Sequence, residues 1–151
     1  MVTFRQITSE NYVAAVRLEV GPGQENFVAS NCRSLVQACY EADWQNPLPM
    51  GIFDGETMVG FVLTIETDEV GPDTIAILRF MIGADHQKKG YGKAAMQALL
   101  DGWRKEGKYK QAGLSYVPSN SVAQRLYASV GFVEVGIKEE YGGEMLALCQ
   151  L

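Results

Sequence analysis

The residues with the clearest chemical potential form a short, basic, glycine-containing turn directly before a helix-like stretch. This turn consists of Gln87, Lys88, Lys89, Gly90, Tyr91, Gly92 and Lys93. The first backbone N–H groups of a helix lack intrahelical partners, and the helix dipole adds about half a positive charge there. Glycines let the backbone approach a ligand closely, and the lysines add full charges. The turn is therefore a candidate site for a phosphate-bearing ligand.

Neither of two common phosphate-binding motifs fits this turn. A P-loop needs four residues between its first glycine and a Gly-Lys-Ser/Thr triplet, whereas six residues separate Gly83 from Gly90 and no serine or threonine follows the lysine. Residues 90–95 match the dinucleotide pattern G-x-G-x-x-A formally. That motif also needs an acidic residue about 20 residues further on, at the end of the next strand. The expected strand end at 115–117 contains no carboxylate.

The apolar pattern around the turn predicts an α/β (α+β) domain over residues 1–151. The run 75–82 is apolar on both faces, which is typical of a strand in the middle of a sheet. The helix expected over 91–106 has an apolar stripe made of Met96, Leu99, Leu100 and Trp103. The other strands are expected at 2–7, 50–53, 58–66, 112–117, 132–137 and 144–148, and a helix at 27–41. We expect a mixed, mostly antiparallel sheet of roughly six to seven strands, with about four helices on its two faces.

A helix expected over 121–130 carries the second group of residues with chemical potential. Its apolar stripe consists of Val122, Leu126 and Val130. Ala123 and Tyr127 are i, i+4 neighbours on an adjacent face, and a small residue beside a tyrosine leaves space next to the phenol. Because a phenol has a reference pKa near 10, Tyr127 is protonated at neutral pH and can act as a general acid. A packing role would also explain this tyrosine.

Two motifs of the chain resemble the signatures of the GNAT family of N-acetyltransferases. The turn at 87–92 fits Q/R-x-x-G-x-G/A, the pattern with which this family binds pyrophosphate. The segment 120–132 closely resembles the family's second pattern, N-x-x-A-x-x-L-Y-x-x-x-G-F. The resemblance covers essentially the whole chain. It implies the GNAT fold, acetyl-CoA as the cofactor, and acetyl transfer to a primary amine by direct attack in a ternary complex.

The resemblance also implies further contacts to the cofactor. A central strand would splay from its neighbour at 114–117, and its free backbone groups would pair with the pantetheine arm. The residues at its splayed end are Phe80, Met81 and Ile82. The backbone N–H of Met81 is the expected donor to the thioester oxygen. The contacts expected from the second motif are Asn120, Ala123 and Tyr127, with the tyrosine as the acid.

The sequence contains no comparable motif for the residues that bind the amine acceptor. A closer likeness to bacterial spermine/spermidine acetyltransferases, carried by residues 22–31 and 78–82, makes a polyamine the expected acceptor. Glu66, late in its strand and near the level where the splay should open, is the expected general base through a water. The candidates for acceptor contacts are Glu25, Phe27, Trp44 and Arg79. Aminoglycosides and a protein N-terminus are alternative acceptors, and a coenzyme A-binding sensor without turnover is an alternative function.

The composition narrows the remaining choices. The chain has 151 residues, of which 47% are hydrophobic, so it can bury a core. Its net charge of −5 argues against nucleic acid as a partner. No apolar segment reaches the roughly 18 residues of a membrane span, and the N-terminus lacks a signal-peptide pattern. We therefore expect a cytoplasmic protein that binds no membrane.

No metal site is expected, and a homodimer through the C-terminal strands would suit the family. Buried free thiols are expected at Cys32, Cys39 and Cys149.

Overall fold

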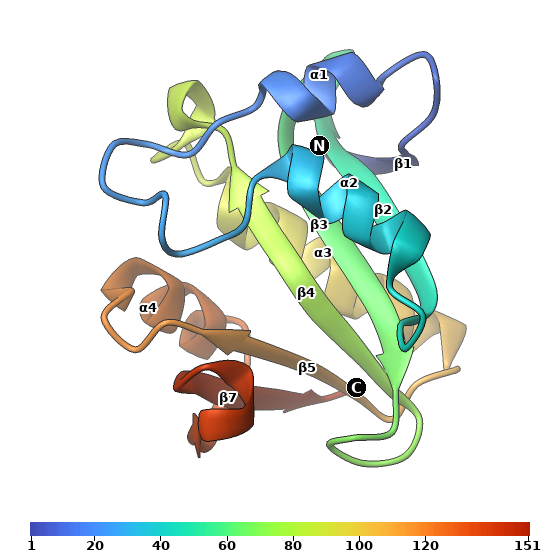
Figure 1. Ribbon diagram of the computed structural model, residues 1–151, viewed down its shortest axis with the longest axis vertical. Helices are drawn as coiled ribbons and strands as arrows, with labels where there is room; N and C mark the ends of the chain where they lie inside the picture. Colours follow the sequence, from blue (N-terminus) through green and yellow to red (C-terminus); the bar gives the residue numbers. More distant parts are fainter.

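The computed structural model describes all 151 residues and contains one seven-stranded sheet between two layers of helices (Figure 1). The strands are β1 (Val2–Gln6), β2 (Gln45–Asp54), β3 (Thr57–Thr67), β4 (Thr74–Ile82), β5 (Gln111–Tyr116), β6 (Val133–Lys138) and β7 (Glu144–Gln150). The helices are α1 (Tyr12–Arg17), α2 (Asn31–Tyr40), α3 (Tyr91–Glu106) and α4 (Ser121–Ser129), with 3-10 turns η1 (Ala84–His86) and η2 (Glu139–Tyr141). No helix is long and apolar enough to cross a membrane.

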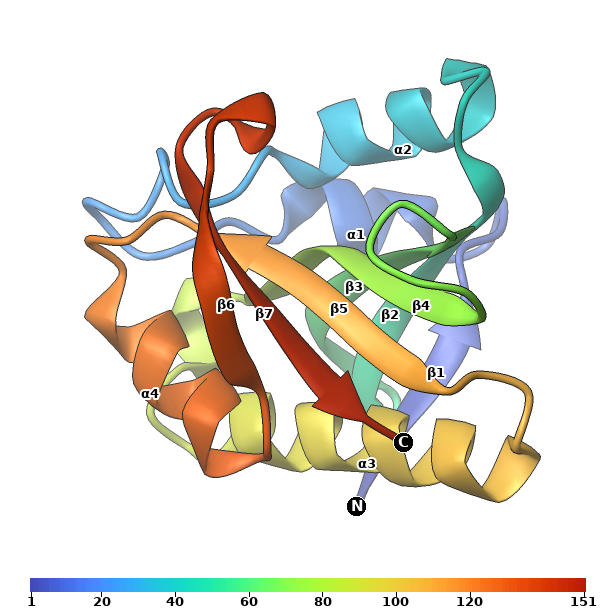
Figure 2. The ribbon, with the colours of Figure 1, turned by 90° about the horizontal axis from the view of Figure 1, so that it is seen from below.

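The sheet has the spatial order β1-β2-β3-β4-β5-β7-β6, and only β4 and β5 run parallel. This confirms the predicted mixed, mostly antiparallel sheet, and the apolar run at 75–82 is its middle strand. Helices α1 and α2 cover one face of the sheet, and α3 and α4 lie on the other (Figure 2). Side chains alternate between the two faces, so Phe61 and Leu63 of β3 pack under α1 and α2, whereas Val62 packs toward α3.

Strands β4 and β5 pair over only part of their length. Thr74–Ile77 is in register with Gln111–Leu114, and beyond these residues the strands diverge (Figure 1). The predicted splay is therefore confirmed, and it opens toward the C-terminal ends of both strands. The expected level of Glu66 is wrong, because Glu66 is in register with Ile75, at the closed end of the splay.

Helix α2 begins later than the sequence pattern indicated. It starts at Asn31 rather than near Phe27, because Ser30 caps it by accepting a hydrogen bond from the Arg33 N–H at 3.2 Å. Residues 26–29 therefore remain a loop. Strand β2 in turn begins before Pro47, and a register shift between Gln45 and Leu48 accommodates the proline.

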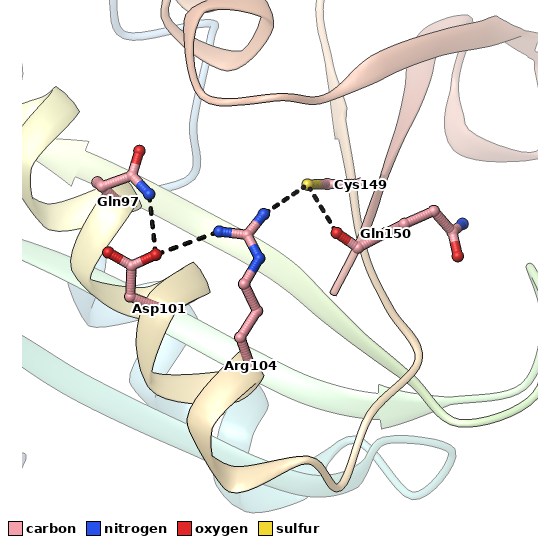
Figure 3. A network of polar contacts seen from close by, with 5 residues as sticks. All are labelled: Gln97, Asp101, Arg104, Cys149 and Gln150. Atoms are coloured by element: carbon pink, nitrogen blue, oxygen red, sulfur yellow. Dashed lines mark hydrogen bonds and ion pairs between the residues drawn. The ribbon is translucent and has the colours of Figure 1, made fainter.

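Arg104, near the end of α3, fastens this helix to β7 (Figure 3). Its guanidinium donates to Asp101 Oδ1 at 3.2 Å and to Cys149 Sγ at 3.7 Å. Burial raises the pKa of the Cys149 thiol, which therefore stays protonated. Cys149 is buried as expected, but the prediction is wrong for Cys32 and Cys39, which lie on the exposed face of α2.

Glu66 has a structural role that can be tested by its pH dependence. Its Oε1 accepts hydrogen bonds from Lys108 Nζ and from the Tyr109 hydroxyl, and the Lys108 hydrogen bond is the main cause of its lowered pKa. A carboxylate whose pKa is lower in the folded state stabilises the fold above its unfolded pKa. That contribution disappears as the pH falls through the folded pKa.

We therefore expect Glu66→Gln to lower the melting temperature by about 2 to 4 °C near neutral pH. The difference from the wild type should vanish as the pH falls toward 3. Thermal melts at several pH values measure this, with Glu106→Gln, an exposed glutamate at the end of α3, as the matched control. A difference that stayed constant down to acid pH would contradict the ion-pair explanation.

Candidate active site

The glycine turn ends in an uncapped helix N-terminus. The first hydrogen bond into α3 runs from the Ala94 N–H to the Gly90 carbonyl at 3.1 Å, and no side chain caps the helix. The N–H groups of Tyr91, Gly92 and Lys93 are therefore available to a ligand. Gly90 has φ 86°, a left-handed conformation that favours glycine. This geometry is suited to binding an anion.

Gln87 holds the turn in place through its side-chain amide. Its Nε2 donates to the Ile82 carbonyl at 3.0 Å and to Gln24 Oε1 at 2.8 Å. Gln24 Nε2 in turn donates to Gln87 Oε1 at 3.1 Å. This amide pair joins the loop before α2 to the turn before α3. No local pattern predicts this role of Gln24, because its partner lies 63 positions away in the chain.

A cavity of about 410 Å³, which we name the turn-side cavity, runs from this turn into the splay. Its lining from the turn includes Gln87, Lys88, Gly90, Tyr91 and Gly92. From the splayed strand and α4 it includes Phe80, Met81, Ile82, Asn120, Ala123 and Tyr127. The structure thus brings together most of the predicted cofactor residues. Lys89 and Lys93 do not line the cavity, and Lys89 Nζ donates to the Asp85 carbonyl at 2.7 Å.

The backbone of β4 presents two free N–H groups at the splay, but that of Met81 is not one of them. The Gly83 N–H donates to the Val59 carbonyl at 2.9 Å, and Met81 is in register with Phe61. Hydrogen-bonded pairs alternate along an antiparallel ladder, so Met81 bonds toward β3. The predicted oxyanion role of Met81 is therefore wrong. The N–H groups of Phe80 and Ile82 face the open side.

Tyr127 lies deep in the turn-side cavity. It packs edge-on against Phe132 with ring centroids 5.9 Å apart, and its ring lies 5.6 Å from that of Tyr116. Burial is the main cause that raises its pKa, and the nearby Tyr116 and Glu144 raise it further. The phenol therefore stays protonated well above neutral pH. The Tyr116 hydroxyl differs, because it donates to Glu134 Oε1.

Helix α4 uses only part of the predicted stripe for packing. Val130 is buried and Leu126 lies partly buried against the core as predicted, but Val122 does not pack there. Val122 is 65% exposed, whereas Ala123, Tyr127 and Val130 are buried. Asn120 caps the helix by accepting a hydrogen bond from the Ala123 N–H at 3.1 Å. The i, i+4 pair of Ala123 and Tyr127 therefore faces the cavity as expected.

A second cavity of about 320 Å³, which we name the loop-side cavity, lies under residues 26–29 and between β4, β5 and β7. Its charged lining residues are Arg33, Glu69, Arg79 and Glu144. The two cavities meet at the splay, since both are lined by Phe27, Val28, Ile77, Leu78, Leu114 and Ser115. A ligand in one cavity can therefore reach a ligand in the other.

Glu144, the first residue of β7, stands at the junction of the two cavities. Its Oε2 accepts a hydrogen bond from the Ser115 hydroxyl, and Ser115 lines both cavities. Its charge raises the pKa of Tyr127 and opposes the lowering of the Arg79 pKa, so it acts on both groups. No role for Glu144 was predicted from the sequence. The glycine pair before it was the only local signal.

The predicted acceptor residues separate into two groups. Phe27 and Arg79 line the loop-side cavity. Glu25 is exposed and lines neither cavity, and Trp44 packs with the core under α1 and α2. Glu66, bound to Lys108 and Tyr109, also lines neither cavity, so it is not placed to act as the base.

Comparisons with known proteins agree with this geometry. The model of the acetyltransferase (GNAT) family matches residues 13–132. A spermine/spermidine N(1)-acetyltransferase from Bacillus subtilis is 26% identical over 99% of both chains. The solved ribosomal-protein-S18-alanine N-acetyltransferase of Escherichia coli has a TM-score of 0.72 at 21% identity, covering 99% of this chain and 94% of that one. An aminoglycoside acetyltransferase solved with coenzyme A has a TM-score of 0.77 at 17% identity, covering 99% and 95%.

The chain therefore belongs to the GNAT family of N-acetyltransferases. Acetyl-CoA is its acetyl donor, and the residues present suit this molecule. The uncapped turn offers N–H groups for the diphosphate, and the unpaired edge of β4 offers N–H groups for the pantetheine amides. The space between Ala123 and Tyr127 suits the thiol end.

Proposed function

We propose that this enzyme transfers the acetyl group directly from acetyl-CoA to the primary amine of a small aliphatic molecule. The observation that carries the proposal is the meeting of the two cavities at the splay. One cavity has the anion-binding turn and Tyr127, and the other is open to a second substrate. Such an arrangement holds both reactants together, which favours direct attack over a covalent enzyme intermediate.

The acid in the proposed mechanism is Tyr127. Acetyl-CoA, when bound, supplies a thioester carbonyl and a thiolate leaving group. Tyr127 donates a proton to the departing sulfur, which its raised pKa permits at neutral pH. The free N–H groups of Phe80 and Ile82 are the available donors to the thioester oxygen. Helix α4 and the Asn120 cap fix the position of the phenol.

The base in the proposed mechanism is Glu144, in place of Glu66. The amine must lose a proton before or as it attacks, and a carboxylate at the junction can accept that proton directly or through a water. The Ser115 hydroxyl fixes the orientation of the Glu144 carboxylate. Glu144→Gln is therefore expected to lower turnover about 100-fold or more without weakening acetyl-CoA binding. Steady-state rates and calorimetry measure the two effects, and an unchanged turnover would contradict the role.

Polyamines are the acceptor class that the name of the Bacillus relative supports. Glu144 at the junction and Glu69 at the loop-side cavity, whose Oε2 accepts from the Tyr141 hydroxyl at 3.3 Å, can bind ammonium groups. Two arginines line the same cavity and limit how much positive charge an acceptor can carry there.

The experiment that tests the proposal is free-thiol release from acetyl-CoA with a panel of amines. The panel contains spermine, spermidine, diamines, diamino acids, an aminoglycoside and a short peptide. Release with an aliphatic amine supports the proposed reaction. Release with only the aminoglycoside or only the peptide would show that the acceptor belongs to that class and is not a small aliphatic amine. Binding of acetyl-CoA by calorimetry without any release would contradict the proposal and favour a coenzyme A sensor.

A homodimer is also part of the proposal, and edge strand β6 supports it. Val133, Val135 and Ile137 are 69%, 55% and 48% exposed on this strand. Exposed apolar side chains on an unpaired edge strand favour association. We expect light scattering to give twice the monomer mass for the wild type and the monomer mass for Val135→Lys. A monomeric wild type would contradict this part.

A further inference from the structure

Arg79 is a half-buried cation whose hydrogen-bonding capacity is only partly used. It lies on the central strand β4 and lines the loop-side cavity. Its Nη1 donates to the Leu78 carbonyl at 2.8 Å and its Nη2 to Gln37 Oε1 at 3.1 Å, and both acceptors are neutral. Its Nε is buried without any partner. Leaving a charged donor in this state is unfavourable unless a ligand completes it.

A second guanidinium faces the same cavity. Arg33 of α2 also lines it, and neither arginine takes part in an ion pair. Burial is the main cause that lowers the pKa of Arg79, and the positive charge of Arg33 lowers it further. The negative charge of Glu144 opposes this lowering of the Arg79 pKa, but its carboxylate is hydrogen-bonded to the Ser115 hydroxyl and not to a guanidinium. Neither of the two arginines in this part of the cavity therefore has a carboxylate bonded to its guanidinium.

The negative and the positive side chains of the loop-side cavity therefore lie in different parts of it. The carboxylate of Glu144 stands at the junction and that of Glu69 at η2, whereas the two guanidinium groups come from β4 and α2. An acceptor that is positive along its whole length, such as spermine, would place some of its charge beside the arginines. An acceptor with a carboxylate in addition to its amines would satisfy all four groups. Guanidinium groups are well suited to this, because they bind carboxylates through two parallel hydrogen bonds.

We propose that the acceptor is an amino-acid-type amine, whose carboxylate binds Arg79 and Arg33 while its reacting amine lies at Glu144. This inference rests on the proposed function and narrows its acceptor class. In the reaction, the amine nitrogen bonds to the acetyl carbon and the carbon–sulfur bond breaks. The amine proton passes to Glu144, and the sulfur gains the proton of Tyr127. A cavity of about 320 Å³ suits a molecule of amino-acid size.

Two matched pairs of amines isolate the contribution of the carboxylate. Ornithine and putrescine differ only by a carboxylate, and so do lysine and cadaverine. For the wild type we expect kcat/KM to be about 100-fold higher for the carboxylated member of each pair, which is the size of a charge-assisted bidentate contact. The readout is thiol release from saturating acetyl-CoA.

Variants of the two arginines connect this preference to the site. Arg79→Gln should abolish the preference, and Arg33→Gln, at an exposed position that is safe for folding, should reduce it about tenfold. The control is Arg17→Gln, an exposed arginine on α1 that lines neither cavity. It should keep the preference. Product analysis identifies the acetylated nitrogen.

The outcomes separate this inference from the proposed function. Equal or better turnover of the diamines by the wild type would overturn the carboxylate requirement and leave amine acetylation intact. A preference that survived in both arginine variants would overturn the assignment to these residues, and equal losses for both members of a pair would show that Arg79 is structural only. Binding of acetyl-CoA with no thiol release in the presence of any amine would overturn the proposed function itself.

Discussion

Replacing Tyr127 by phenylalanine is expected to lower turnover by about 100- to 10,000-fold, the usual contribution of a general acid. The reason is that the phenol is the protonated group placed beside Ala123 at the thiol end of the turn-side cavity. Phenylalanine keeps the ring, so the contacts with Phe132 and Tyr116 remain. The affinity for acetyl-CoA should therefore change less than about threefold. Single-turnover rates and calorimetry measure the two quantities separately.

A matched control is available in the neighbouring tyrosine. Tyr116 also lines the turn-side cavity, but its hydroxyl donates to Glu134, and burial is the main cause that raises its pKa to about 12. Tyr116→Phe should reduce stability by the loss of that hydrogen bond and leave turnover within a few-fold of the wild type. Equal losses of turnover and acetyl-CoA affinity in Tyr127→Phe would show that this ring binds the cofactor and has no acid role.

The pH dependence follows from the same environment. Burial and the nearby Tyr116 and Glu144 hold the Tyr127 pKa above the ordinary value of about 10. The phenol therefore remains a proton donor throughout the range in which the enzyme can be assayed. We attribute any rise of the wild-type rate with pH to deprotonation of the amine. The residual rate of Tyr127→Phe should still rise with pH, because this substitution removes only the proton donor to the sulfur.

The elements that the sequence predicted well are those whose signals are local. Helix α3 runs from Tyr91 to Glu106 as expected, because glycines with φ 86° and 67° stand at its two ends. The run at 75–82, apolar except for Arg79, placed β4 in the middle of the sheet for the physical reason that both of its faces are covered. The errors arose where a local signal was overlooked. Ser30 shortens α2, and a bulge admits Pro47 into β2.

The candidate site was predicted on the side where motifs exist and missed where contacts are long-range. The turn and the pair of Ala123 and Tyr127 are defined by spacing within one helix or loop. Glu144 reaches the junction only because β7 pairs with β5 and brings it to Ser115. The misplacement of Glu66 has the same origin, because the direction in which the splay opens depends on the register of β4 with β5.

Replacing Gly92 by aspartate is expected to have the second large effect, because it should weaken acetyl-CoA binding about 100-fold. An anion at this turn would receive hydrogen bonds from the N–H groups of Tyr91, Gly92 and Lys93, which have no other acceptor. Hydrogen bonds to a charged group contribute about 1.5 kcal/mol each, and the loss of two corresponds to about 100-fold in Kd. The aspartate would compete for these N–H groups and repel the diphosphate.

The same substitution should not harm the fold, which separates the ligand effect from misfolding. A carboxylate in the first turn of a helix interacts favourably with the helix dipole, so the melting temperature of Gly92→Asp without ligand should equal or exceed that of the wild type.

Gly92→Ala is the steric control. A Cβ there would lie 3.5 Å from Leu126 Cδ2 and 3.7 Å from Ile82 Cγ1, which are ordinary contacts. Its affinity should therefore stay within about threefold. Wild-type affinity in Gly92→Asp would mean that the diphosphate binds elsewhere, whereas equal losses in both variants would mean that the turn is too tight for any side chain.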